Sequence, residues 1–262
     1  MWGYERHTNH LIRFEPDRGG TSPSGLSPAT LRSVYSLPST GGGGTIAIVD
    51  AFHYATAEND LNVFSTAFGL PQCTTANGCF KQVYASGSKP RANCGWAQEA
   101  ALDIEWAHAM APNAKIVLVE AATNSFANLF AAVDVATAQV TANGGHGQVS
   151  MSWSGSEFST EASNDSHFQN NNVVYFASSG DTGGVNGYPS VSPYVVSAGG
   201  TSVAECKWFI EQRNWMERQR RRTQQVRASP RLAIGTTKRR PDAPLGAGFF
   251  VRRRPQYGSV GV

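Results

Sequence analysis

The stretch Gly41-Gly-Gly-Gly-Thr-Ile-Ala-Ile-Val-Asp50 decides the fold class of this 262-residue chain. A glycine run leads into an unbroken apolar segment, which begins at Thr45 and ends on a carboxylate. A continuous apolar run of this length is typical of a strand that is buried on both faces. Lys115-Ile-Val-Leu-Val-Glu120 has the same form. We therefore expect a sheet that is covered on both sides.

Helical patterns alternate with these strands. We expect helices at 29–35, 57–68, 97–109, 125–143 and 160–170, and further strands at 148–153, 173–177 and 194–197. Strands separated by helices of about ten to fifteen residues predict βαβ units and a parallel α/β sheet with helices on both faces. In such sheets the functional residues gather just beyond the carboxyl ends of the strands. Asp50, Trp153 and Asp181 fall at such positions.

The chain changes character after Cys206. Up to that residue it carries eight Lys and Arg against sixteen Asp and Glu, whereas from residue 207 the numbers are fourteen and three. The basic segment lacks apolar periodicity, so it is either a basic arm for nucleic acid or an out-of-frame translation product. Because the change is abrupt, we favour the second interpretation and expect no nucleic-acid partner. We divide the chain into a linker or pro-segment remnant (1–27), a partial domain (28–206) and a basic, non-native, poorly packed tail (207–262).

Membrane and export signals are not evident in the sequence. No apolar run reaches the 18 residues typical of a membrane span, so we expect no membrane partner. The first 20 residues are charged and broken by Pro16, unlike a secretory signal peptide.

Cys73 and Cys79 frame a short polar loop that contains a turn signal, Asn77-Gly78. We favour a disulfide with its Cα atoms within about 7 Å, which indicates an oxidising compartment. Two free thiols at a surface turn are the alternative, because pairing cannot be derived from spacing. Zinc is not expected, since Cys94 and Cys206 have no second ligand at finger-like spacing.

Glu99 and Asp103 are candidate proton-transfer groups. They lie four residues apart on an expected helix, which places their Cβ atoms about 5–6 Å apart. Two like charges at that spacing destabilise a helix unless one proton is shared, and a carboxyl pair that shares a proton is an acid–base device. Such pairs are also common on solvated helix faces, which is the alternative. Glu105 falls on a different face.

Asp181 and the strand end at Ser152 and Trp153 are the other candidates. Asp181 follows an apolar strand on a loop with neighbouring glycines. A protonated carboxyl there can donate a hydrogen bond to an oxyanion, and the alternative is an Asp that caps a turn. Ser152 and Trp153 combine an aromatic with a small residue, which suits the wall of a peptide-binding cleft. Ordinary core packing of Trp153 is the alternative.

Taken in order, these segments resemble the sedolisin family of serine-carboxyl peptidases, whose fold is that of subtilisin. The resemblance runs from about Gly25 to Val203; each piece is only moderately specific, and the ordered set is highly so. Beyond the segments above, it includes Ser27-Pro-Ala-Thr-Leu-Arg-Ser-Val-Tyr-Ser-Leu37, Phe68-Gly-Leu-Pro-Gln-Cys73, Met110-Ala-Pro-Asn-Ala-Lys-Ile116 and Ser192-Pro-Tyr-Val-Val-Ser-Ala-Gly-Gly-Thr201.

The resemblance implies a subtilisin-like parallel sheet, incomplete at its C-terminal end, with 28–206 as a partial sedolisin-type peptidase domain. It implies that Glu99 is the general base, Asp103 its supporting acid and Asp181 the oxyanion-hole acid. Asp50 sits where subtilisins keep their triad aspartate, as a further member of the carboxyl network. The resemblance also implies protein or peptide substrates, secretion into the extracellular space, and proteolysis in acid. We expect Glu99 and Asp103 to face Asp181 across a cleft, with Trp153 on its wall.

Two parts of the family's site have no counterpart in this sequence. The family nucleophile belongs to a Ser-Gly-Thr-Ser-Ala-type turn; Gly199-Gly-Thr-Ser202 comes too soon after Asp181, and Ile234-Gly-Thr-Thr237 offers no serine. The family's calcium site lies near its C-terminus, where Asp242 is a poor match, so we expect no metal and no cofactor. We therefore expect an inactive serine-type endopeptidase with no serine hydroxyl near Glu99. The alternative is a non-catalytic fragment or a binding module with a basic tail.

Overall fold

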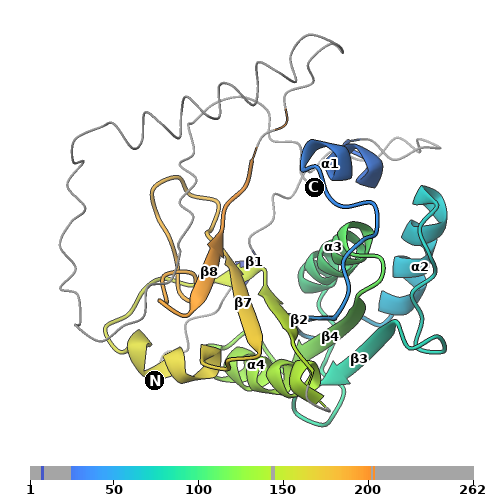
Figure 1. The fold of residues 1–262 in the computed structure, drawn as a ribbon. Helices are drawn as coiled ribbons and strands as arrows, with labels where there is room; N and C mark the ends of the chain where they lie inside the picture. Colours follow the sequence, from blue (N-terminus) through green and yellow to red (C-terminus); the bar gives the residue numbers. More distant parts are fainter. Residues whose placement is uncertain (1–6, 9–24, 143–144, 202, 204–262) are drawn as a thin grey trace, which may run out of the picture. The chain divides into compact units, whose positions relative to one another are not determined.

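The structure is a computed structural model that describes residues 7–8, 25–142, 145–201 and 203 (Figure 1). The described residues up to Thr201 belong to one unit of the chain. Ser202, Cys206, Asp242 and almost the whole of the expected tail lie outside the described residues. What the sequence predicts for them therefore stays a prediction.

Six strands form a sheet in the order β3-β4-β2-β5-β7-β8, and every neighbouring pair runs parallel. The predicted parallel sheet is confirmed. One strand, β3, was not expected, because its sequence Phe-Lys-Gln-Val-Tyr has no continuous apolar run. Among the described strands it lies at the edge of the sheet, beside β4, so polar side chains are tolerated there. The bounds are β2 Thr45–Ala51, β3 Phe80–Tyr84, β4 Lys115–Ala121, β5 Gly147–Met151, β7 Val173–Ser178 and β8 Val195–Ala198.

Helices cover both faces of this sheet, as the sequence predicted (Figure 1). Alternate side chains of β2 enter two different cores, because successive residues of a strand point to opposite faces. Ala47 and Val49 pack in the core that includes α4, whereas Ile48 packs with Leu61 of α2 and Ile104 of α3. The helices are α1 Pro28–Val34, α2 Ala57–Phe68, α3 Cys94–Met110 and α4 Phe126–Thr141.

Two segments differ from the sequence-based expectation. The expected strand 148–153 is divided: β5 ends at Met151, and β6 (Trp153–Ser154) pairs antiparallel with β1 (His7–Thr8) outside the main sheet. The expected helix 160–170 is instead a 3-10 helix, η2 (Glu161–Phe168), whose polar sequence offers little apolar surface to pack. In the described part of the chain, no helix has the length and apolar character that crossing a membrane requires.

Candidate active site

The helix α3 carries both members of the predicted carboxyl pair. It begins at Asn93, whose side chain accepts a hydrogen bond from the Trp96 backbone N–H and so caps the first turn. Glu99 lies on the buried side of the helix and is only 2% exposed, whereas Asp103, one turn later, is half-buried. The solvated-face alternative is therefore wrong for Glu99.

The hydroxyl of Ser152 contacts this carboxyl pair. Ser152 Oγ donates a hydrogen bond to Asp103 Oδ1 at 2.8 Å, and a hydrogen bond with the same side chain lowers the pKa of Glu99. The expectation of no serine hydroxyl near Glu99 is wrong. The reason is local: β5 ends at Met151, so the next residue leaves the carboxyl edge of the sheet beside α3.

Burial and the charge of Asp181 raise the pKa of Glu99 to about 7. Burial acts first, because a carboxylate loses its hydration when it enters the protein interior. The contribution of Asp181 shows that this residue, on the loop after β7, lies within electrostatic reach of α3. Gly180 precedes it with φ of 86°, a conformation that favours glycine and turns the chain sharply after the strand. Asp181 itself is exposed.

Asp50 is the most deeply buried of the predicted acids. It is 1% exposed, and neither carboxyl oxygen has a hydrogen-bond partner among the described residues. Burial, then the charges of Asp103, Glu99 and Glu120, raise its pKa well above the usual range. The electrostatic link to both α3 carboxyls supports the expectation that Asp50 joins the network.

Glu120 is a buried acid that the sequence analysis did not single out. It pairs in register with Asp50 across the β2–β4 ladder. Its Oε1 accepts hydrogen bonds from Tyr54 N at 2.8 Å and Gln82 Nε2 at 2.6 Å, and its Oε2 lies 2.9 Å from His53 Nδ1. A signal was available: the apolar runs of β2 and β4 both have an acid in sixth place, and parallel pairing in register brings the two together.

Trp153 does not line a cleft. Its side chain is fully buried, and its Nε1 donates to the backbone carbonyl of Val49 at 2.9 Å. Its ring packs against Phe126 and Phe130 at centroid distances of 6.4 and 6.3 Å. The cleft-wall prediction is therefore wrong, and core packing is the role that the structure supports. The physical reason is that a strand end next to an aromatic cluster buries an indole more favourably than it exposes one.

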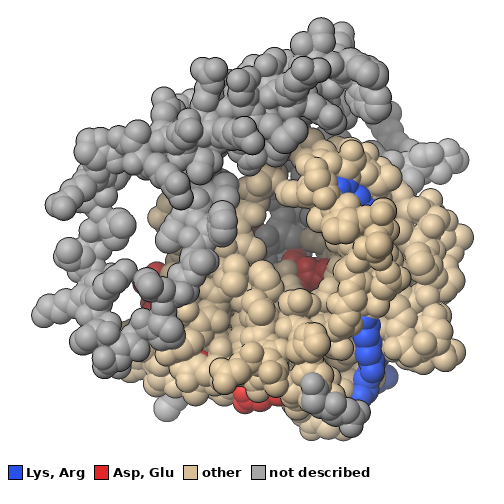
Figure 2. Space-filling view, in the orientation of Figure 1, with Lys and Arg blue, Asp and Glu red and all other residues tan. Residues whose placement is uncertain are grey.

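The structure thus brings together Glu99, Asp103 and Ser152, and both Asp50 and Asp181 lie within electrostatic reach of Glu99. In the view of Figure 2, acidic side chains lie at the floor of a hollow in the described surface, in the region where Figure 1 shows α3. The pKa values of Glu99 and Asp50 are raised, and carboxyls of this kind beside a hydroxyl can accept, hold and donate protons at neutral and acid pH. Chemically, the arrangement is an acid–base device.

Comparison with known proteins supports the fold. No family model and no curated protein matches the chain. Among solved structures, the chain is similar to Pseudomonas sedolisin, a serine-carboxyl proteinase, in a complex with two molecules of pseudo-iodotyrostatin. The TM-score is 0.55 and the sequence identity 21%, over 72% of this chain and 56% of the sedolisin chain. The described part of the chain therefore has the subtilisin-like α/β fold of that sedolisin, and the match spans 56% of that protein's length.

Proposed function

We propose that residues 28–206 are part of a serine-carboxyl endopeptidase domain that acts on proteins or peptides in acid. Glu99 is the general base, Asp103 supports it, and Asp181 supplies the oxyanion hydrogen bond. The observation that carries this proposal is the burial of Glu99 on a helix that also bears Asp103; burial and the charge of Asp181 raise the pKa of Glu99 to about 7. A titratable group that is perturbed by burial and a specific charge partner is typical of a functional site.

The coupling between Glu99 and Asp181 explains how one site can hold a base and an acid at low pH. A charged Asp181 raises the pKa of Glu99, so a proton on Asp181 removes that repulsion and lowers the pKa of Glu99. Protonation of Asp181 and the lower pKa of Glu99 both favour the catalytic state. A protonated Asp181 can donate to an oxyanion, and an ionised Glu99 can accept a proton from a nucleophile. The productive state therefore contains a proton on Asp181, which acid favours.

In our proposal, this chain lacks the nucleophile of the peptidase site. The sequence has no Ser-Gly-Thr-Ser turn at the expected place, and the Ser152 hydroxyl donates a hydrogen bond to Asp103, the supporting acid. A hydroxyl bonded in this way supports the carboxyl pair. We therefore expect the chain as given to release no peptides. The calcium site that the family resemblance implies falls among residues that the structure does not describe, and no step here depends on calcium.

Secretion belongs to the same proposal. The Cys73–Cys79 disulfide supports it, because disulfides persist in oxidising compartments. Protein or peptide substrates follow from the reaction class alone.

A digestion assay tests the proposal directly. The chain as given is incubated with casein or haemoglobin at pH 3–5, and released peptides are counted against a Glu99→Ala variant; both should be inactive. A chimera then joins residues 25–206 to the C-terminal segment of a complete serine-carboxyl peptidase, including its serine turn. This chimera should hydrolyse casein, Glu99→Ala should abolish the activity, and Glu157→Gln, at an exposed position, should not.

Two results would contradict the proposal. A chimera that folds, as shown by circular dichroism, and remains inactive would remove Glu99 from the role of base. Peptide release by the chain as given, lost in Ser152→Ala, would make Ser152 the nucleophile and contradict its assignment as a support.

A further inference from the structure

The helix α3 places a second reactive group in the core, one turn beyond the carboxyl pair. His108 is fully buried, and its Nε2 lies 2.8 Å from the carbonyl oxygen of Pro71. A carbonyl oxygen can only accept a hydrogen bond, so Nε2 carries the ring proton and donates it. In the neutral ring the lone pair is therefore on Nδ1. That atom is buried and has no hydrogen-bond partner among the described residues.

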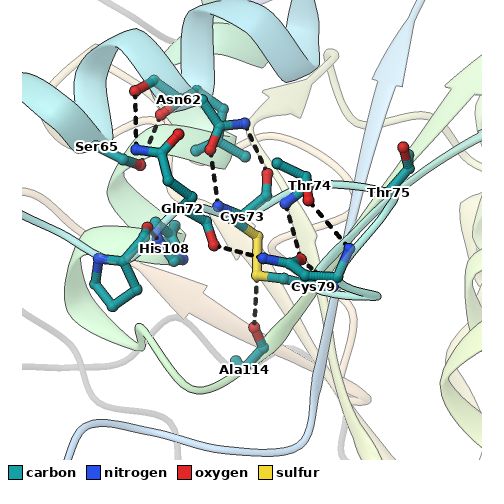
Figure 3. The surroundings of a disulfide bond; sticks show 12 residues. Asn62, Ser65, Gln72, Cys73, Thr74, Thr75, Cys79, His108 and Ala114 are labelled. Carbon is teal, nitrogen blue, oxygen red and sulfur yellow. Dashed lines mark hydrogen bonds between the residues drawn. A yellow bond between two sulfur atoms is a disulfide. The ribbon is translucent and has the colours of Figure 1, made fainter.

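An unpaired buried acceptor is costly, on the order of 1–3 kcal/mol, so the position of this nitrogen needs an explanation. Its neighbours provide one. A ring nitrogen of His108 and the sulfur atoms of Cys73 and Cys79 all lie within 4.8 Å of one another. Cys73 is buried and Cys79 is half-buried, so the three-residue cluster is closed on the side of Cys73 and more open on the side of Cys79. Figure 3 shows His108 beside the disulfide.

The polypeptide around the two cysteines is held by bonds that do not depend on the disulfide (Figure 3). Asn62 accepts from Cys73 N at 2.8 Å and donates to Cys73 O at 2.9 Å. Asn77 accepts from the backbone of Thr74 and of Cys79, both at 3.0 Å, and donates to Gln72 O at 2.8 Å. The loop therefore keeps its two sulfur positions close together if the bond between them is broken.

We propose that the reduced protein binds one thiophilic metal ion, of the zinc or copper(I) class, through the thiolates of Cys73 and Cys79 and Nδ1 of His108. The reductant is a thiol or a phosphine, and it supplies the two electrons that break the S–S bond. Two protons from water complete the two thiols. Metal binding releases these two protons, because thiolates and not thiols are the ligands.

The chemistry of the three ligands fits such an ion. Thiolate and imidazole are the donors that zinc prefers, at about 2.3 Å and about 2.0–2.1 Å. A tetrahedral ion with these bond lengths separates its ligand atoms by about 3.5–3.8 Å. Atoms that already lie within 4.8 Å reach that spacing when the sulfurs separate and the ring approaches. The hydrogen bond from Nε2 to the Pro71 carbonyl is the outer contact that usually fixes a metal-bound histidine.

The metal-bound form and the disulfide form of the protein link different segments of the chain. The disulfide closes a loop within residues 73–79, whereas the metal ion joins that loop to α3. The site lies on the helix of Glu99 and Asp103, but this inference goes beyond the proposed peptidase function and does not rest on it.

Cobalt spectroscopy on the full chain tests the proposal. Cys94→Ser and Cys206→Ser remove the other two thiols, and the protein is reduced with a phosphine in the absence of oxygen. Titration with Co²⁺ should saturate at one equivalent and should produce a thiolate-to-cobalt charge-transfer band with the intense visible bands of a tetrahedral ion. Zn²⁺ should displace the cobalt and abolish the spectrum. The oxidised protein should show neither band.

Two variants complete the test. His108→Gln should weaken cobalt binding by at least about 10-fold. His146→Gln, at an exposed histidine, should bind as the parent does. If His108→Gln does not fold, Cys79→Ser replaces it and should lose most of the charge-transfer intensity. Unchanged affinity in either ligand variant would overturn the proposal. So would a reduced protein that loses its circular dichroism signal and takes up no cobalt.

Discussion

Two buried carboxyls on neighbouring strands have opposite surroundings. Glu120 accepts hydrogen bonds from Tyr54 and Gln82 and is paired with His53, whereas Asp50, beside it in the ladder, accepts none from the part of the chain that the structure describes. An ionised carboxylate without partners is strongly unfavourable in the interior, and its neighbours here are also acids. Asp50 therefore keeps its proton well above the usual pKa range.

Asp50→Asn tests this difference. Asparagine has nearly the same shape and cannot ionise, so the variant should be about as stable as the parent at pH 3.5, which lies below the ordinary aspartate pKa of 3.8. The raised pKa of Asp50 means that the parent loses stability as pH rises, because the unfolded chain ionises more readily. The variant should therefore be the more stable protein at pH 8. Urea denaturation at both pH values measures this; a parent and a variant with the same pH dependence would contradict it.

Ser152 offers a test of the carboxyl pair itself. Its hydroxyl donates to Asp103 and lowers the pKa of Glu99, so Ser152→Ala should raise the pKa of Glu99 above about 7. It should also destabilise the protein by about 1–3 kcal/mol at neutral pH, where a buried acceptor loses its donor. The titration of Glu99 is followed by carboxyl ¹³C NMR. Ser86→Ala, which removes an exposed hydroxyl, should change neither quantity; an unchanged Glu99 titration in Ser152→Ala would contradict the contact.

At the scale of elements, α3 is the support of both candidate sites. It holds Glu99 in its first half, Asp103 in its middle and His108 near its end, so its position matters to both sites. The Asn93 cap fixes the first turn through its bond to Trp96 N at 3.1 Å. Asn93→Ala should destabilise the protein by about 1 kcal/mol, and Asn93→Ser should recover most of that loss. Chemical denaturation measures both; equal losses in the two variants would mean that the cap contributes nothing.

The strands β2 and β4 were predictable because each contains a continuous apolar run that only burial on both faces explains. The edge strand β3 was not, because exposure at the edge removes the apolar signal from Phe80–Tyr84. The carboxyl pair on α3 was predictable from its spacing. The contact of Ser152 with that pair was not, because it depends on where β5 ends, and boundaries are the least certain part of a sequence-based prediction. Trp153 shows the same limit: a strand-end aromatic has the same sequence whether it faces a cleft or a core.

At the scale of the whole molecule, the carboxyls with raised pKa values fall into separate electrostatic groups. Glu99 belongs to the group with Asp181, and burial with the charge of Asp60 raises the pKa of Glu105 to about 7 in a separate group. Glu105 therefore faces other partners than Glu99 does, as its helix position predicted. Because Glu105 is only partly buried, solvent screening reduces its effect on stability. Glu99 is the better probe of how the folded state responds to pH.

The last prediction concerns that response. The ordinary pKa of a glutamate is 4.5 and that of Glu99 in the folded chain about 7, so between these values the folded state holds a proton that the unfolded state has lost. Glu99 thus makes the stability fall as pH rises through this window, by at most about 1.4 kcal/mol per pH unit. We expect a higher melting temperature at pH 5 than at pH 8. Glu99→Gln should flatten the profile, whereas Glu157→Gln, at an exposed position, should leave it unchanged. A Glu99→Gln profile as steep as the parent's would show that this carboxyl titrates alike in both states, and the proton-holding role proposed for it would fail.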